Sequence, residues 1–143
     1  HFRRVRFRSI EGMTYAEIEQ NLPENHKAWH GRNADFRPQG GESLRDFYSR
    51  VVDGATRISK AHLGQTIVMV AHGGVLDCMY RAATDMTIEA PRHFDLLNTS
   101  LNRLTFDGER FHLVSWGDVS HLSDQKAMDE LDGSKPSVPW SLP

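Results

Sequence analysis

The feature that most constrains the fold is a short apolar run that leads into His72, Gly73 and Gly74. Residues 66–71 are rich in β-branched and apolar side chains without alternation, which indicates a strand buried on both faces. Such strands belong to parallel sheets covered by helices. The apolar spacing of residues 74–84 predicts a helix directly after the glycines. The order of strand, turn and helix therefore predicts an α/β fold.

Three interpretations of the turn between this strand and helix are available. The unpaired N–H groups and the dipole at the helix start favour a small anion, and His72 would lie where open α/β sheets bind ligands. A tight turn that simply needs glycine is the second interpretation. The third, the oxyanion hole of an ester hydrolase, requires a Gly-x-Ser-x-Gly motif that the sequence does not contain. The His-Gly-Gly motif alone leaves the first two open.

Composition narrows the classes of partner. The chain has 143 residues, the length of one domain, and its 17 basic and 19 acidic side chains nearly balance. We therefore expect no nucleic-acid partner, and no apolar run reaches the roughly 20 residues that cross a membrane. Its single cysteine, Cys78, cannot form an internal disulfide, so a cytoplasmic protein is expected. Because the sequence begins at His1 within an arginine-rich stretch, we expect it to be a fragment.

Local signals organise the first half of the chain. Thr14 and the glutamate three residues later predict a capped helix that ends at Pro23. Residues 24–41 are polar and contain two prolines, which predicts a long loop with one helical turn near residues 26–30. An apolar stripe at spacings of three and four then predicts a helix over residues 44–62.

The second half contains a hairpin signal. Residues 100–106 and 110–116 flank an Asp-Gly pair, which predicts two antiparallel strands. Beyond the hairpin the composition becomes polar and acidic with several prolines. We therefore expect a domain over residues 1–122 and a polar tail over residues 123–143.

Four segments together give the chain a family resemblance: residues 10–18, 38–44, 68–74 and 97–101. In this order and spacing they resemble the histidine phosphatase superfamily, the phosphoglycerate mutase-like proteins. The resemblance implies a three-layer α/β sandwich with a mainly parallel central sheet, here incomplete. It covers most of the chain.

The resemblance also implies a chemistry. Such proteins transfer or hydrolyse phosphate monoesters of small molecules through a phosphohistidine, without metal or cofactor. The match makes His72 the second catalytic histidine, a phosphate ligand, with the backbone of Gly73 and Gly74 beside it. By the same resemblance Arg32 is a candidate substrate contact and Glu11 a candidate acid.

One motif of the family is missing from this sequence. No Arg-His-Gly occurs, and Arg92-His93 lacks the glycine and follows His72, so we expect the chain to lack its nucleophile. Without the nucleophile strand, residues 66–71 would expose an apolar edge. A second copy, the arginine-rich start or the missing portion could cover it, and a homodimer is expected. A non-catalytic phosphate-binding or interaction module, or an α/β fragment without a site, are the alternatives.

Overall fold

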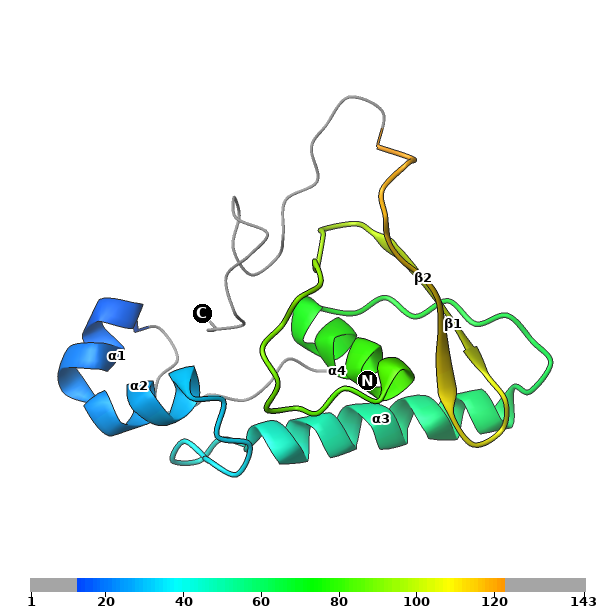
Figure 1. The fold of residues 1–143 in the computed structure, drawn as a ribbon. Coiled ribbons are helices and arrows are strands. Elements are labelled where there is room, and N and C mark those ends of the chain that lie inside the picture. The colour runs from blue at the N-terminus through cyan, green and yellow to red at the C-terminus, as the bar shows by residue number, and fades with distance from the viewer. Residues whose placement is uncertain (1–12, 123–143) are drawn as a thin grey trace.

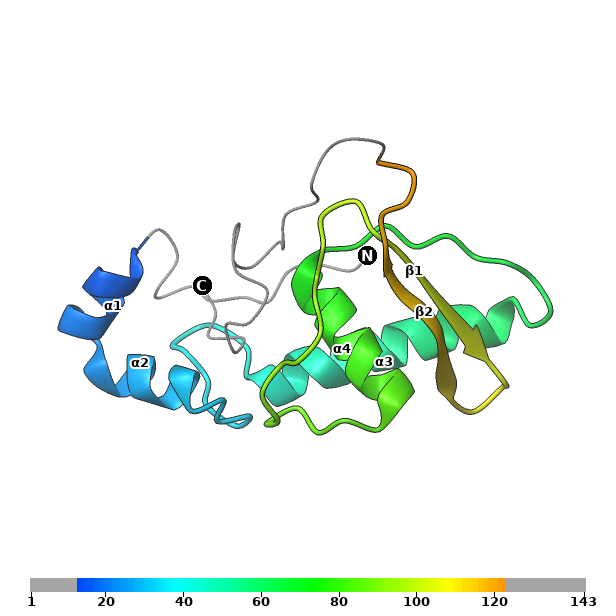
Figure 2. The same ribbon diagram turned by 45° about the horizontal axis from the view of Figure 1, so that its top comes forward.

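The computed structural model describes residues 13–122 of the chain. The arginine-rich start, Glu11 and the polar tail lie outside these residues. The elements are helices α1 (Tyr15–Asn21), α2 (Pro23–His30), α3 (Leu44–Ala61) and α4 (Gly73–Thr84) and strands β1 (Leu101–Phe106) and β2 (Phe111–Asp118). Helix α4 crosses α3, and the hairpin of β1 and β2 lies at the opposite end of α3 from α1 and α2 (Figures 1 and 2).

The first two helices start where their capping residues place them. Thr14 and Glu17 form the predicted capping box of α1, because each side chain bonds the backbone of the other residue. The prediction of a single helical turn near residues 26–30 is wrong, since α2 is an eight-residue helix that begins at Pro23. Proline suits a first helical position, where its missing N–H would have no partner. Pro23 therefore ends one helix and begins the next.

Helices α3 and α4 carry the core. Ser43 and Asp46 form the capping box of α3, and Phe47, Val51 and Ala55 are buried on one stripe of this helix, as predicted. They pack with Val75, Cys78 and Met79 of α4 and with Phe111 of β2. The spacing of three and four aligns these apolar side chains on facing helix surfaces. These side chains form the core between α3, α4 and the hairpin.

Residues 66–71 differ from the sequence prediction. The segment is not a strand in this structure and has no strand partner among the described residues. Val68 is 85% exposed and Val70 93% exposed, so the prediction of a strand buried on both faces is wrong here. A strand is buried only when neighbouring strands and helices cover it. Val68 and Val70 of this segment are therefore in contact with solvent.

The described sheet is the predicted hairpin. β1 and β2 pair antiparallel, with Phe106 opposite Phe111, and the turn contains Gly108 at a φ of 109°. Asp107 accepts hydrogen bonds from the backbone N–H groups of Glu109 and Arg110, which closes the turn. The described chain is thus α/β with a small antiparallel sheet.

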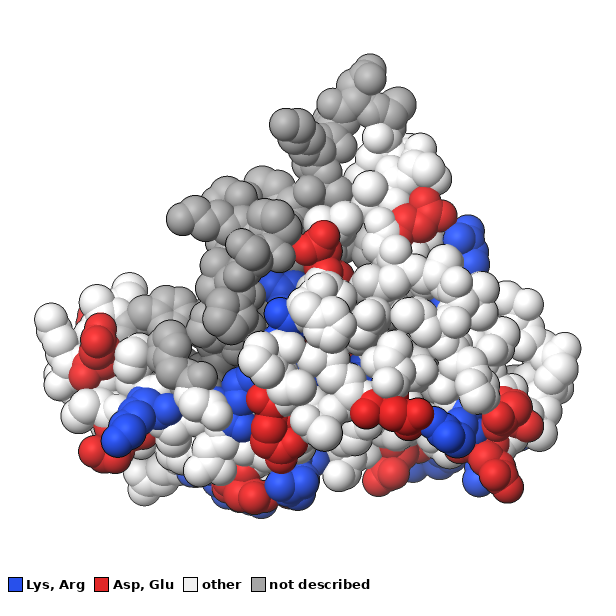
Figure 3. Space-filling model, viewed as in Figure 1, with Lys and Arg blue, Asp and Glu red and all other residues white. Residues whose placement is uncertain are grey.

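Charges of both signs are mixed on the surface. Lys and Arg alternate with Asp and Glu along the edge formed by α3, while the face over the hairpin is largely uncharged (Figure 3). Among the helices of residues 13–122, none has the length and apolar character needed to span a membrane.

Asp118, at the end of β2, should make the free energy of unfolding depend on pH in the acid range. Hydrogen bonds from Ser120 and the Arg103 guanidinium lower the pKa of Asp118 to about 2. A carboxyl pKa lowered by folding stabilises the native state above the unfolded pKa of about 3.9, and this stabilisation is lost as pH falls towards the native value. We expect Asp118→Asn to reduce the fall in the free energy of unfolding between about pH 4 and pH 2. Urea unfolding across that range measures the free energy of unfolding, and a fall in Asp118→Asn equal to that of the wild type would contradict the prediction.

Candidate functional site

His72 stands at the N-terminus of α4. It is the N-cap residue, with extended backbone angles (φ −97°, ψ 160°), and its carbonyl accepts hydrogen bonds from the N–H groups of Val75 and Leu76. The imidazole makes no capping hydrogen bond, and the residue is exposed. No acidic side chain lies in the first turn of α4 to offset the positive end of the helix dipole. The imidazole is thus beside a helix terminus that favours an anion.

The two glycines after His72 differ in their surroundings. Gly73 is buried and Gly74 is half-buried. A Cβ at Gly74 would lie 3.4 Å from Cε1 and 3.5 Å from Cζ of Phe47. Gly74 therefore lets the start of α4 approach α3 closely, a packing reason for glycine that the motif did not reveal.

Arg32 points into the protein. The residue is 6% exposed, and its Nε and Nη2 donate to the carbonyl oxygen of Ile88 over 3.0 and 2.5 Å. Its Nη2 lies 3.9 Å from Oδ2 of Asp77 on α4. Burial, followed by the nearby charge of Arg81, lowers the pKa of Arg32 to about 10. The guanidinium thus joins the loop after α2 to the loop after α4.

The buried face of α4 carries an ion pair that the sequence analysis did not predict. Asp77 and Arg81 are each 1% exposed, and Nε of Arg81 donates to Oδ2 of Asp77 over 2.9 Å. Nη1 of Arg81 donates to the carbonyl oxygens of Thr87 (2.6 Å) and Ala90 (2.9 Å). The spacing of four residues within a helix was the available signal. Asp77 therefore stands between two buried guanidinium groups.

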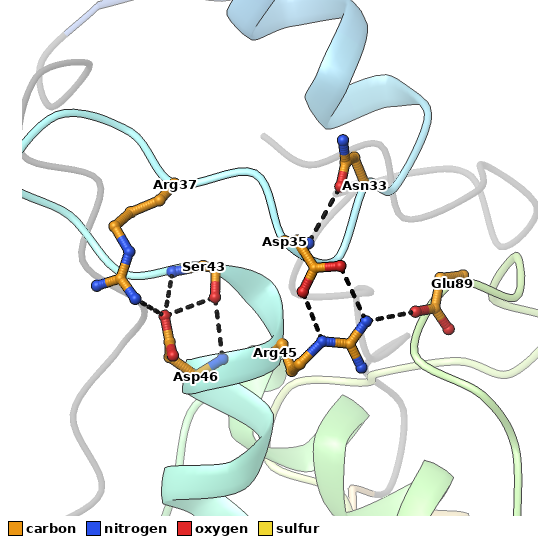
Figure 4. A network of polar contacts seen from close by, with 7 residues as sticks. All are labelled: Asn33, Asp35, Arg37, Ser43, Arg45, Asp46 and Glu89. Atoms are coloured by element: carbon orange, nitrogen blue, oxygen red, sulfur yellow. Dashed lines mark hydrogen bonds and ion pairs between the residues drawn. The ribbon is translucent and has the colours of Figure 1, made fainter.

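An exposed network joins the same two loops at the surface. Arg45, on the first turn of α3, donates to both carboxylate oxygens of Asp35 and to Glu89 (Figure 4). The hydrogen bond from Arg45 lowers the pKa of Asp35. Beside it Arg37 pairs with Asp46 over 2.6 Å, so this arginine belongs to the cap of α3. The loop after α2 is thus held to α3 and to the loop after α4.

The other candidate groups carry structural roles. Arg92 is buried in a loop and donates to the carbonyl oxygen of Phe94, while His93 is exposed beside Tyr80. Cys78 is buried in the core, as expected for a small apolar residue, and burial raises the pKa of its thiol. Within residues 13–122 no cluster of three or more His, Cys, Asp or Glu side chains could hold a metal ion.

A cavity of about 340 Å³ separates the extended segment from the hairpin. Ile67 and Met69 line one side of it, and Leu104, Thr105 and Phe106 of β1 line the other. β1 pairs with β2 alone among the described strands, so its second edge has no strand partner there. The extended segment and β1, whose second edge has no strand partner among the described strands, thus border one space lined by both polar and apolar side chains.

Comparisons with known proteins agree on one family. The sequence profile of the histidine phosphatase superfamily (branch 1) matches residues 1–119. The chain is 39% identical over 118 residues to phosphoglycerate mutase-like protein 4 of Arabidopsis thaliana, covering 80% of this chain and 50% of that protein. It is 34% identical over 116 residues to metal-independent phosphoserine phosphatase of the same plant, covering 80% and 47%.

A solved structure gives the same result for the fold. Bacillus stearothermophilus YhfR superposes with a TM-score of 0.73 at 30% identity, covering 85% of this chain and 61% of that one. The chain therefore spans about half the length of the two plant relatives, at 50% and 47%, and somewhat more of the structural one.

Proposed function

Because the chain belongs to the histidine phosphatase superfamily, we propose that it supplies the phosphate-holding part of an enzyme that transfers or hydrolyses phosphate monoesters. The observation that carries the proposal is the exposed imidazole of His72 at the N-terminus of α4. The helix dipole and the first backbone N–H groups favour a phosphoryl group there. In this role His72 is the phosphate ligand, and Gly73 and Gly74 supply the adjoining backbone.

The chemistry of the proposal needs a nucleophile from elsewhere. An attacking histidine nitrogen forms a bond to phosphorus while the bond from phosphorus to the ester oxygen breaks, and the leaving oxygen takes a proton from an acid. The sequence has no Arg-His-Gly to provide that histidine. We therefore assign the attacking group to a polypeptide segment outside these 143 residues, with Glu11 as a candidate acid.

The same segment would complete the fold. The cavity lies between residues 67–69, which have no strand partner among the described residues, and β1, which pairs there on one edge only; apolar side chains of both contribute to its lining. A strand inserted there would pair with both segments and bury Ile67 and Met69. We propose that it converts residues 66–71 into a strand of a mainly parallel central sheet in a three-layer domain. Residues 1–122 belong to this domain, and residues 123–143 follow it as a tail.

The substrate proposed is a phosphorylated small molecule. Phosphoserine is the first compound to assay, because one relative is named a metal-independent phosphoserine phosphatase. No nucleic-acid partner is proposed, since the 17 basic and 19 acidic residues nearly balance. A cytoplasmic location fits the free, buried thiol of Cys78.

A second candidate function rests on the exposed apolar segment. Val68 and Val70 project into solvent, and such side chains favour association. The second candidate is a homodimer that binds phosphate without catalysis, an interaction module on the same scaffold. Its interface would contain Val68 and Val70. In both candidates His72 holds a phosphate.

Two assays on the 143-residue chain test the proposal. Titration with inorganic phosphate, followed by NMR of the backbone amides, should shift the signals of Gly73 and Gly74 and saturate. Hydrolysis of para-nitrophenyl phosphate and of phosphoserine should not exceed the buffer rate. An absence of saturable shifts would refute the phosphate site, and hydrolysis lost on His72→Ala would show that the chain contains its own nucleophile.

A further inference from the structure

We propose that Arg32, Asp77 and Arg81 form a positioning cluster, which fixes the phosphate-binding end of α4 relative to the two neighbouring loops. The proposal rests on the phosphate site proposed above. None of the three residues was expected to act in this way from the sequence, where Arg32 was a candidate substrate contact. The cluster acts through the backbone that it holds.

The cluster has one carboxylate and two guanidinium groups. Oδ2 of Asp77 lies 2.9 Å from Nε of Arg81 and 3.9 Å from Nη2 of Arg32. Oδ1 of Asp77 and Nη2 of Arg81 have no hydrogen-bond partner in the described part of the chain. Asp77 therefore supplies the negative charge between two buried arginines, because two like charges buried together repel.

The two arginines hold one loop from two directions. Arg81 donates to the carbonyl oxygens of Thr87 and Ala90, and Arg32 donates to the carbonyl oxygen of Ile88, which lies between them. Asp77 and Arg81 belong to α4, the helix whose N-cap is His72. The middle of this helix is therefore connected to the loop. Arg32 adds the loop after α2 to the same point.

The backbone at Arg32 supports a dedicated role. Its φ of 48° lies in the left-handed region, which costs free energy for a residue other than glycine and persists where the surroundings hold it. The contacts to Ile88 and Asp77 are such surroundings. The positive φ of Arg32 thus occurs together with a buried, hydrogen-bonded guanidinium.

The exposed arginine Arg45 provides a matched comparison. It also joins the loop after α2, through Asp35, to the loop after α4, through Glu89 (Figure 4). Its side chain is 53% exposed, so water and salt screen its ion pairs, whereas the contacts of Arg32 are buried. Both arginines connect the same two loops, but the buried Arg32 also lies 3.9 Å from Asp77 of α4. The cluster therefore predicts opposite outcomes for the two substitutions.

The experiment measures the affinity of the 143-residue chain for inorganic phosphate. Arg32→Gln should weaken binding at least about tenfold and move the amide signals of Gly73 and Gly74 before phosphate is added. Arg45→Gln should stay within about twofold. Val51→Ala, at a fully buried position of α3 outside the cluster, controls for loss of stability alone, and it should keep the wild-type affinity.

Each outcome decides a separate claim. If the wild-type chain fails to bind phosphate, both the phosphate site and the positioning role of the cluster are refuted. Wild-type binding with equal affinities for Arg32→Gln and Arg45→Gln overturns only the positioning role, and so does an equal loss in Arg32→Gln and Val51→Ala. Should Arg32→Gln fail to fold, Arg32→Lys replaces it, because lysine keeps the charge but loses the two-nitrogen contact with Ile88. Wild-type affinity in that variant also overturns the proposal.

Discussion

His72→Ala should weaken the binding of inorganic phosphate to the 143-residue chain by about 10- to 100-fold, because hydrogen bonds to charged groups contribute about 1.5–3 kcal/mol. The imidazole is exposed at the N-cap of α4 and makes no capping bond, so its removal deletes a ligand contact and leaves the helix start intact. Phosphate titration followed by NMR measures the affinity. The midpoint temperatures of thermal unfolding of the wild type and of His72→Ala should agree closely.

His93→Ala is the matched control for this substitution. His93 is also exposed, but it lies in the loop after α4 rather than at a helix start. Its ring meets Tyr80 edge-on at 6.3 Å, a contact that has no part in the proposed site. Phosphate affinity should be unchanged. A loss in His93→Ala that equals the loss in His72→Ala would move the anion site away from α4.

The double substitution Val68→Lys/Val70→Lys should weaken self-association of the chain at least about hundredfold. The two valines are 85% and 93% exposed in the described structure, and fully burying one valine contributes roughly 1.5–3 kcal/mol. A two-fold dimer buries each of them twice, and lysine at an edge opposes pairing with another strand. Sedimentation equilibrium across a range of concentrations measures the dissociation constant.

Val114→Lys serves as the control for added charge. Val114 is 60% exposed on β2, and it lies outside the extended segment. Its substitution should leave the dissociation constant unchanged. A wild-type chain that stays monomeric at high concentration would exclude the homodimer. An equal effect of Val114→Lys would show that added charge, and not loss of the extended segment, weakens association.

The contacts around α4 add a structural role for two residues that the motifs selected, Gly74 and Arg32. Gly74 was expected to admit phosphate oxygens, and the structure adds that its missing Cβ makes room for the Phe47 ring. Arg32 was expected at the substrate, and its guanidinium instead bonds a carbonyl 56 residues away in the sequence. Neither contact could be predicted from the local sequence, because the two partners lie in segments that only folding brings together.

The sequence by itself determined the elements whose causes are local. The capping box at Thr14, the apolar period of three and four in residues 44–62 and the Asp107-Gly108 turn each act within a few residues, and the structure confirms the helices and the hairpin that they predict. The family resemblance was equally readable, because its motifs are short and ordered, and the match over residues 1–119 confirms it.

Only the tertiary structure decided which of these elements are covered and where the charged side chains point. Residues 66–71 have the composition of a buried strand, yet Val68 and Val70 face solvent, because burial of a strand depends on neighbours that the local sequence does not contain. The Asp77–Arg81 pair likewise required the carbonyl groups of the following loop to meet it in space. Local signals set helix ends and turns, whereas burial and ion pairing arise from contacts between distant segments.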